Sequence, residues 1–254
     1  MELRGRVALV TGAGRRLGRA IAAALAGRGL RVALHHHTSA NGAAEVRDEV
    51  REAGGDAECF AADLRDADAA RALPGRVFER FGRLDVLVNS AAVMHRLRLE
   101  ETTPEQWDDI LNLNLRAVFF CTQGAASALR EAKGSVINLA DVGGLEPWPG
   151  FAAHSVSKAG VVMLTRVLAL DLAPEVRVNT IAPGAVLVPD TYDQAARDAL
   201  VRSTPLRRLG TPGDVTAAVL YLLEHGDYIT GTVLTVDGGR AVRVSSAVEG
   251  QGGG

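Results

Sequence analysis

A glycine-rich segment close to the start of the chain could bind a phosphate group. Between a Val-rich run and a helix-like stretch come Thr11, Gly12, Gly14, Arg15, Arg16, Leu17 and Gly18. Glycines allow a tight turn and a close approach of the backbone, and a helix that begins there offers unpaired N–H groups to an anion. The third glycine falls one residue late for the strict dinucleotide pattern, so the nucleotide interpretation depends on the position of the segment after a first strand.

The residues after the second expected strand bear on which nucleotide would bind. A site that prefers NAD has an acidic residue about 20 residues beyond the glycines, but here three histidines, Thr38 and Ser39 occur instead. We expect Arg15 and Arg16 to point toward the same pocket as His37, Thr38 and Ser39. Guanidinium groups without a carboxylate predict a 2′-phosphate site and therefore NADP(H). Either arginine alone could instead be a solvated surface residue. Consecutive histidines on a strand face opposite ways, so no metal site is expected.

A second candidate for chemistry is a histidine four residues before a lysine. His154 and Lys158 would share one face of a helix and could line one cleft. Imidazole is the usual general acid or base in proteins. The chain has 28 basic residues, of which only Lys133 and Lys158 are lysines. A lysine that persists in so arginine-rich a chain suggests a place where a tunable amine is needed.

The elements that would position these groups alternate along the chain. Short continuous apolar runs, typical of strands buried on both faces, occupy residues 7–10, 32–34, 57–62, 86–88, 136–139, 176–181 and 233–236. Amphipathic helix-like stretches lie between them, at 17–26, 43–53, 67–81 and 152–172, and Thr103-Pro104 and Thr211-Pro212 begin two further helices. This order predicts a doubly wound α/β fold, a Rossmann fold with a seven-stranded parallel sheet and helices on both faces.

Length and composition limit the class of protein. At 254 residues with 47% hydrophobic and 23% charged residues, the chain fits one globular domain, expected over residues 1–240 with a loosely held tail at 241–254. The net charge of −2 gives no basic surface for nucleic acid, and no apolar run has the length of a membrane span. Two cysteines make no disulfide framework, so a cytoplasmic location is expected. The expected partner is a small-molecule substrate.

Taken together, these segments resemble the short-chain dehydrogenase/reductase family over nearly the whole chain, residues 7–239. The resemblance implies a homotetramer with a nicotinamide cofactor. It implies that the adenine is contacted by Asp63 and Leu64, and that further cofactor contacts come from Asn89, Ser90, Ala91, Pro183 and Gly184. It also implies that Lys158 holds the nicotinamide ribose and that Asn114 positions a proton-relay water.

Three details resemble the pteridine-reductase branch of the family. Arg16 stands where the family usually has a small residue, and the histidine-rich segment resembles a His-x-His-Arg-Ser stretch, with Thr38 in place of the arginine. Asp141 takes the position of the usual catalytic serine, 13 residues before the catalytic tyrosine position. Where that branch has an aromatic residue to stack on the pterin, this chain has Met94, which could pack on a ring less specifically.

One departure from the family pattern concerns the catalytic residue itself. The motif Tyr-x-x-x-Lys reads here as His154 to Lys158, so the tyrosine that donates the proton is replaced by histidine. Three functions stay open. The first is an NADPH-dependent reductase of a pterin-like or other carbonyl or imine substrate, with Asn114, Asp141, His154 and Lys158 as catalytic residues. The second is a generic alcohol/ketone oxidoreductase, and the third is a non-catalytic NADPH-binding protein.

Overall fold

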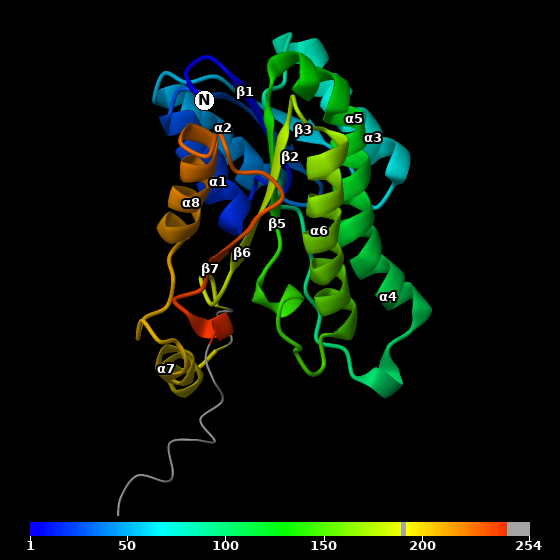
Figure 1. Cartoon of the computed structure of the whole chain (residues 1–254), viewed down its shortest axis with the longest axis vertical. Helices are drawn as coiled ribbons and strands as arrows, with labels where there is room; N and C mark the ends of the chain where they lie inside the picture. Colours follow the sequence, from blue (N-terminus) through cyan, green and yellow to red (C-terminus); the bar gives the residue numbers. More distant parts are fainter. Residues whose placement is uncertain (189–191, 243–254) are drawn as a thin grey trace, which may run out of the picture.

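The computed structural model describes residues 1–188 and 192–242, and its centre is a seven-stranded parallel sheet (Figure 1). The strands follow the order β3-β2-β1-β4-β5-β6-β7. Their bounds are β1 Val7–Val10, β2 Arg31–His36, β3 Ala57–Ala61, β4 Val86–Asn89, β5 Ser135–Leu139, β6 Arg177–Pro183 and β7 Val233–Val236. Each of the seven apolar runs is a strand, so the predicted doubly wound Rossmann architecture is confirmed. The reversal of strand order between β1 and β4 places a ligand crevice at that point of the carboxyl edge.

Helices cover both faces of the sheet (Figure 1). Apolar residues of α1, α2 and α8 pack on one face and those of α3, α5 and α6 on the other. The helices are α1 Arg16–Gly27, α2 Ala40–Glu52, α3 Ala67–Phe81, α4 Pro104–Leu111, α5 Ala117–Ala132, α6 Ala152–Asp171, α7 Gln194–Ser203 and α8 Pro212–Glu224. None of the helices in these described ranges is long and apolar enough to cross a membrane.

The helix ends follow local chemistry. Thr103 and Gln106 cap α4 reciprocally, with Gln106 N 3.3 Å from Thr103 Oγ1 and Thr103 N 3.0 Å from Gln106 Oε1. This confirms the predicted start of α4, and Thr211 begins α8 in the same way. Helix α2 begins at Ala40, three residues earlier than expected, and its first turn packs so closely on the glycine-rich segment that a Cβ on Gly42 would lie 2.1 Å from Gly14 O.

Asp237 holds the last residues that the structure describes. Residues 240–242 form a short 3-10 turn, in which Ala241 N donates to Asp237 Oδ2 at 2.6 Å. The remainder of the expected tail, residues 243–254, lies outside the described residues.

Candidate active site

The glycine-rich turn between β1 and α1 is packed tightly around its glycines. A Cβ on Gly18 would lie 2.2 Å from the Gly12 carbonyl oxygen, and one on Gly14 would lie 2.5 Å from the Ser39 carbonyl oxygen. Gly12 has φ +67°, in the left-handed region. No side chain caps the N-terminus of α1, and no acidic residue lies in its first turn. This open helix end at the carboxyl edge fits an anionic phosphate, as the sequence predicts.

Thr11 ties this turn to the end of β4. Its Oγ1 accepts hydrogen bonds from Ser90 N at 2.9 Å and Ala91 N at 3.0 Å. Asn89 donates to Asn138 Oδ1 at 2.8 Å and so links β4 to β5. On the far side of the crevice, Gly184 N donates to Val236 O at 3.0 Å. The predicted cofactor residues from β1, β4 and the end of β6 therefore lie along one edge of the sheet.

His35 anchors the same turn from β2, a role that its place in the triple histidine does not reveal. Its Nδ1 accepts from Gly12 N at 3.1 Å, and its Nε2 lies 3.1 Å from Ala62 O. These partners require a neutral ring with the proton on Nε2. Burial of the ring is the main cause that lowers the pKa of His35 to about 4.

We expect the protein to lose stability in mild acid because of His35. The unfolded chain takes up a proton near pH 6.5, whereas the folded ring resists protonation down to about pH 4. The contribution of neutral His35 to the free energy of unfolding is therefore complete above pH 6.5 and falls by about 3 kcal/mol between pH 6.5 and pH 4. Urea unfolding measured from pH 7 to pH 4 should show this fall, and His35→Gln should flatten it. His37→Gln, which changes an exposed histidine nearby, should keep the wild-type pH dependence; equal slopes in all three proteins would refute the assignment.

Only some of the residues expected to bind the 2′-phosphate lie close together. Ser39 packs on Gly14, and His37 Nε2 lies 3.9 Å from Asp63 Oδ2, so these residues meet beside the turn. Arg15 is exposed there. Arg16 differs from the expectation, because its Nη2 donates to Leu187 O at 2.5 Å, beyond β6 and away from β2. The Arg16 backbone has φ +52°, in the left-handed region that glycine adopts most readily.

Asp63 and Leu64, the residues expected to contact the adenine, follow β3. Leu64 is buried, and Asp63 Oδ1 accepts from Arg65 N at 3.0 Å. Arg65 Nε also donates to Asp109 Oδ1 of α4 at 2.5 Å. Burial tends to raise the pKa of Asp63, but the hydrogen bonds and charges of Arg65 and His37 outweigh it, and the net pKa is lowered. Asp63 is therefore a carboxylate at neutral pH.

Asn114 is held by an irregular turn between α4 and α5. Residues Asn112–Arg116 form a π-helical turn, a feature that often marks functional sites. Asn114 Oδ1 accepts a hydrogen bond from Val93 N at 2.9 Å, and Asn114 Nδ2 donates one to Val93 O at 2.9 Å. Nδ2 also lies 3.2 Å from Ser157 Oγ of α6. The amide thus fixes the backbone after β4 against the helix that carries His154.

His154 and Asp141 form a close pair. His154 Nε2 lies 2.6 Å from Asp141 Oδ2, and His154 Nδ1 lies 3.4 Å from Val93 O. Both ring nitrogens thus face oxygen atoms. The Trp148 ring stacks on the imidazole at an interplanar angle of 11°. The His154 side chain is 3% exposed and that of Asp141 is 21% exposed, so Asp141 is the outer member of the pair.

Lys158 lies beneath this pair, one helical turn along α6. Its Nζ donates to Leu139 O at 2.8 Å at the end of β5, and the side chain is buried. Burial lowers the pKa of Lys158, and the Asp141 carboxylate opposes this shift. For Asp141, burial raises the pKa, but the His154 hydrogen bond and the Lys158 charge outweigh it, so its net pKa lies below the ordinary value. The four predicted catalytic residues therefore form one cluster.

Several contributors to this site were not predicted. Trp148 and Ser157 touch the cluster through a ring stack and a hydroxyl, and the Val93 backbone joins two of its side chains. Gly42 brings α2 onto the glycine-rich turn, because a Cβ there would lie 2.1 Å from Gly14 O. The contact between α2 and Gly14 depends on tertiary packing, so the pattern of apolar residues in the sequence does not reveal it. Within the described residues, no group of His, Cys, Asp and Glu side chains is arranged to hold a metal ion.

Comparisons with known proteins agree with this architecture. The family model described as enoyl-(acyl carrier protein) reductase matches residues 12–241. The 3-oxoacyl-(acyl-carrier-protein) reductase FabG of Staphylococcus aureus (strain Mu50) is 37% identical over 237 residues, which cover 91% of this chain and 96% of that protein. The 3beta-hydroxysteroid dehydrogenase 1 of Eggerthella lenta is 37% identical over 246 residues, 94% of either chain.

A solved structure gives the same result in three dimensions. A crystal structure described as a short-chain alcohol dehydrogenase from Sinorhizobium meliloti 1021 superimposes with a TM-score of 0.90 at 34% identity, covering 96% of this chain and 99% of that one. The residues matched by the family model, 12–241, include the π-helical turn and the helix with His154 and Lys158. This chain is therefore a member of the short-chain dehydrogenase/reductase family of oxidoreductases.

Proposed function

We propose that the protein is an NADPH-dependent reductase that transfers a hydride to the carbonyl or imine carbon of a small molecule. The observation that carries the proposal is the convergence of Asn114, Asp141, His154 and Lys158 at the sheet edge that also bears the open N-terminus of α1. A bound reduced nicotinamide would supply the hydride. A phosphate-binding turn and a proton-handling cluster on one crevice are the two parts that such a reaction needs.

The residues of this chain would divide the work. The turn from Gly12 to Gly18 would hold the pyrophosphate, and Asp63 the adenine. The Lys158 ammonium, fixed by the Leu139 carbonyl, would bind the nicotinamide ribose. With a carbonyl substrate, the proton would pass from His154 by way of Asp141, because Asp141 is the outer member of the pair. Asn114 would keep this arrangement rigid through Val93.

NADPH should bind at least tenfold more tightly than NADH, because no acidic residue comes directly after β2 and exposed Arg15 can reach a phosphate. Calorimetric titration of the protein with each dinucleotide measures this preference. Arg15→Ala should reduce it, since a charge-assisted hydrogen bond contributes about 1.5–3 kcal/mol. Arg16→Ala is the matched control, since Arg16 binds Leu187 instead, and it should leave the preference intact. Tighter binding of NADH would refute the assignment.

The substrate class has a second candidate. Two of the relatives named above are, by name, a 3-oxoacyl-(acyl-carrier-protein) reductase and a 3beta-hydroxysteroid dehydrogenase, which favours a generic carbonyl or alcohol substrate. A pterin-like substrate is favoured by Arg16, Asp141 and the histidine-rich segment after β2. NADPH oxidation followed with a dihydropterin and with simple ketones separates the two. NADPH binding without turnover of any substrate would favour the hypothesis of a non-catalytic NADPH-binding protein.

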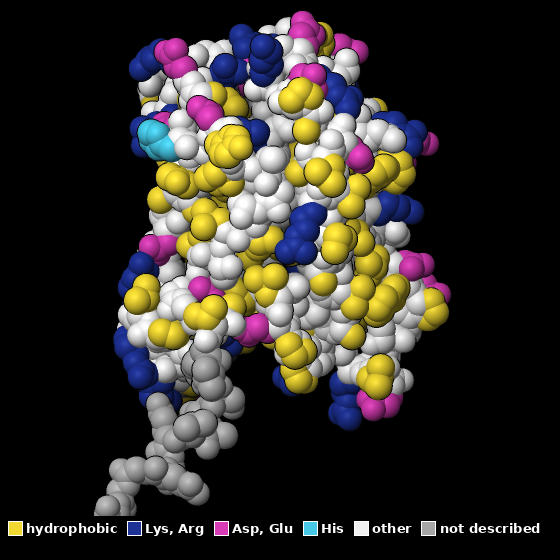
Figure 2. All heavy atoms as spheres, viewed as in Figure 1, with side chains coloured by type: hydrophobic (Ala, Val, Ile, Leu, Met, Phe, Trp, Pro, Cys, Tyr) yellow, Lys and Arg dark blue, Asp and Glu magenta, His cyan; other side chains and the backbone are white. Residues whose placement is uncertain are grey.

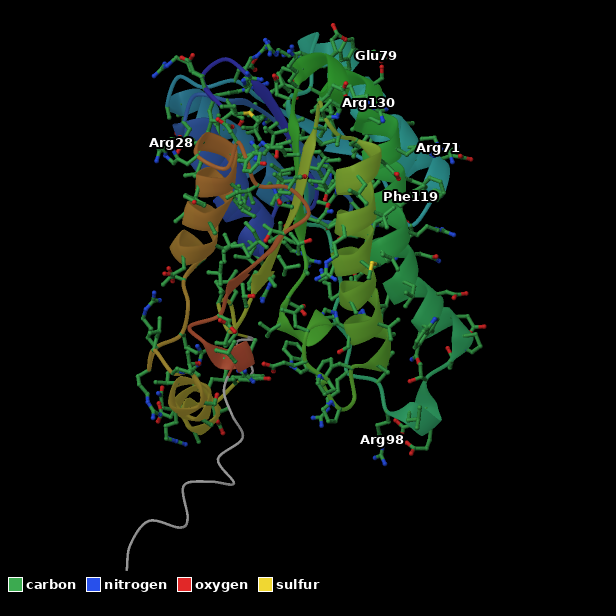
Figure 3. All side chains as sticks on the ribbon, in the orientation of Figure 1. Arg28, Arg71, Glu79, Arg98, Phe119 and Arg130 are labelled. Atoms are coloured by element: carbon green, nitrogen blue, oxygen red, sulfur yellow. The ribbon has the colours of Figure 1, made fainter. Side chains whose placement is uncertain are left out.

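A homotetramer is part of the same proposal. Apolar side chains stand exposed on α5 and α6, among them Phe119, Met163, Val167 and Leu170. Figure 2 shows hydrophobic groups gathered over these two helices, and Figure 3 labels Phe119 on α5. Covering such a surface with a second copy removes apolar area from water. Light scattering measures the assembly, and a monomer at micromolar concentration would count against it. The cytoplasmic location stays a prediction.

A further inference from the structure

The polar groups of the catalytic cluster are already engaged within the protein. Both ends of the Asn114 amide bind the Val93 backbone, and Lys158 is buried on the Leu139 carbonyl. His154 has Asp141 against one ring nitrogen and the Val93 carbonyl against the other. The imidazole is also covered by Trp148 and almost wholly buried. His154 therefore presents no N–H group to a substrate.

Asp141 is the exception, because its side chain is the one in the His154 pair that reaches the surface. Its net pKa lies below the ordinary value for a carboxyl, so the group is ionised at neutral pH. An ionised carboxylate only accepts hydrogen bonds. Oδ2 faces His154, whereas the second oxygen, Oδ1, is buried beside Gly143 and has no side-chain hydrogen-bond partner among the described residues, so it is the oxygen with an acceptor position left. Asp141 thus places a negatively charged hydrogen-bond acceptor where the reduction of a carbonyl needs a hydrogen-bond donor to the substrate oxygen.

A carboxylate in this place disfavours a ketone and favours a cation. Reduction of a carbonyl builds negative charge on oxygen, and that charge would develop beside Asp141. A protonated imine carries positive charge and an N–H donor, and both complement the carboxylate. We propose that the substrate is a protonated imine whose N–H⁺ group donates to Asp141, and this proposal rests on the proposed function.

The reaction then needs no proton from the protein. The C=N carbon gains a hydride from a reduced nicotinamide, and the two π electrons become the nitrogen lone pair. The nitrogen keeps its proton, the cationic imine becomes a neutral amine, and the oxidised nicotinamide carries the positive charge away. This balance explains how the cluster can work with histidine in the place of a donor tyrosine. His154 acts as a positioning residue, because it holds Asp141 ionised and in place.

The test compares an imine with a ketone of the same shape. The probes are 2-methyl-1-pyrroline and 2-methylcyclopentanone, and the readout is kcat/KM for NADPH oxidation. We expect the imine to be reduced at least tenfold faster. Asp141→Asn should lower kcat/KM for the imine about 100-fold while NADPH still binds, because a charge-assisted hydrogen bond is lost. Glu146→Gln, a neutralised acid on the same loop, is the control and should match wild type.

Two further measurements test the roles of His154 and Asp141 separately. His154→Tyr, which restores a hydroxyl donor, should raise ketone reduction relative to imine reduction. Calorimetry in the presence of NADP⁺ should show that protonated 2-methylpyrrolidine binds to wild type and binds at least tenfold more weakly to Asp141→Asn, whereas neutral 2-methylcyclopentanol should not distinguish the two. Faster reduction of the ketone than of the imine, or equal affinity of wild type and Asp141→Asn for the amine, would overturn the proposal. Failure to bind NADPH at all would instead overturn the proposed function.

Discussion

Replacing Lys158 with Met is expected to lower kcat about 100- to 1000-fold, the effect of removing one preorganised charge from a water-poor site. The Lys158 ammonium is buried, bound to the Leu139 carbonyl and close to Asp141. Its loss removes the proposed ribose contact and the charge that helps to keep Asp141 ionised. NADPH affinity should fall as well. Steady-state kinetics and calorimetric titration measure the two effects separately.

The chain offers a matched control for this substitution. Lys133 is the other lysine of the sequence, and it lies exposed at the end of α5. Lys133→Met should retain wild-type turnover. Lys158→Met should stay folded, because methionine fills much of the lysine volume and removes a costly buried charge. Wild-type kcat in folded Lys158→Met would contradict the assigned role.

Replacing Gly18 with Ala is expected to weaken NADPH binding at least 100-fold. The new Cβ would lie 2.2 Å from the Gly12 carbonyl oxygen, far inside van der Waals contact. Both partners are backbone of the same turn, so relief requires the turn itself to move by about 1 Å, and displacements of this size can cost about 100-fold. Titration with NADPH measures the loss.

Gly75→Ala controls for the general effect of such a change. Gly75 lies on the exposed side of α3, and no atom lies within 4 Å of its added Cβ. Alanine there should raise stability by about 0.5–1 kcal/mol through helix propensity and leave NADPH binding unchanged. Equal NADPH affinity in Gly18→Ala and Gly75→Ala would show that the turn does not hold the cofactor.

The fold could be predicted from the sequence because each layer leaves a local signal. Strands buried on both faces read as continuous apolar runs, and α4 and α8 begin at Thr-Pro pairs that cap them. The start of α2 could not be predicted in the same way. Asn and Gly weaken a helix, and only contact with Gly14 shows why residues 40–42 belong to it.

The site could be predicted where residues share an element or an edge. His154 and Lys158 are one helical turn apart, and Asp141 follows the neighbouring strand, so their meeting follows from topology. The direction of Arg16 could not be predicted, because a flexible side chain on a left-handed residue can reach either side of the turn. The anchoring role of His35 also depends on pairing between β1, β2 and β3.

Hydride transfer in this crevice is the central claim, and isotope transfer tests it most directly. The measurement follows deuterium from NADPH labelled at the transferable C4 position into the product formed from 2-methyl-1-pyrroline or 2-methylcyclopentanone, by mass spectrometry. The wild-type protein should place one deuterium on the former C=N or C=O carbon, and Lys158→Met should place far less in the same time. Unlabelled product, or no product from either probe with NADPH bound, would contradict the account.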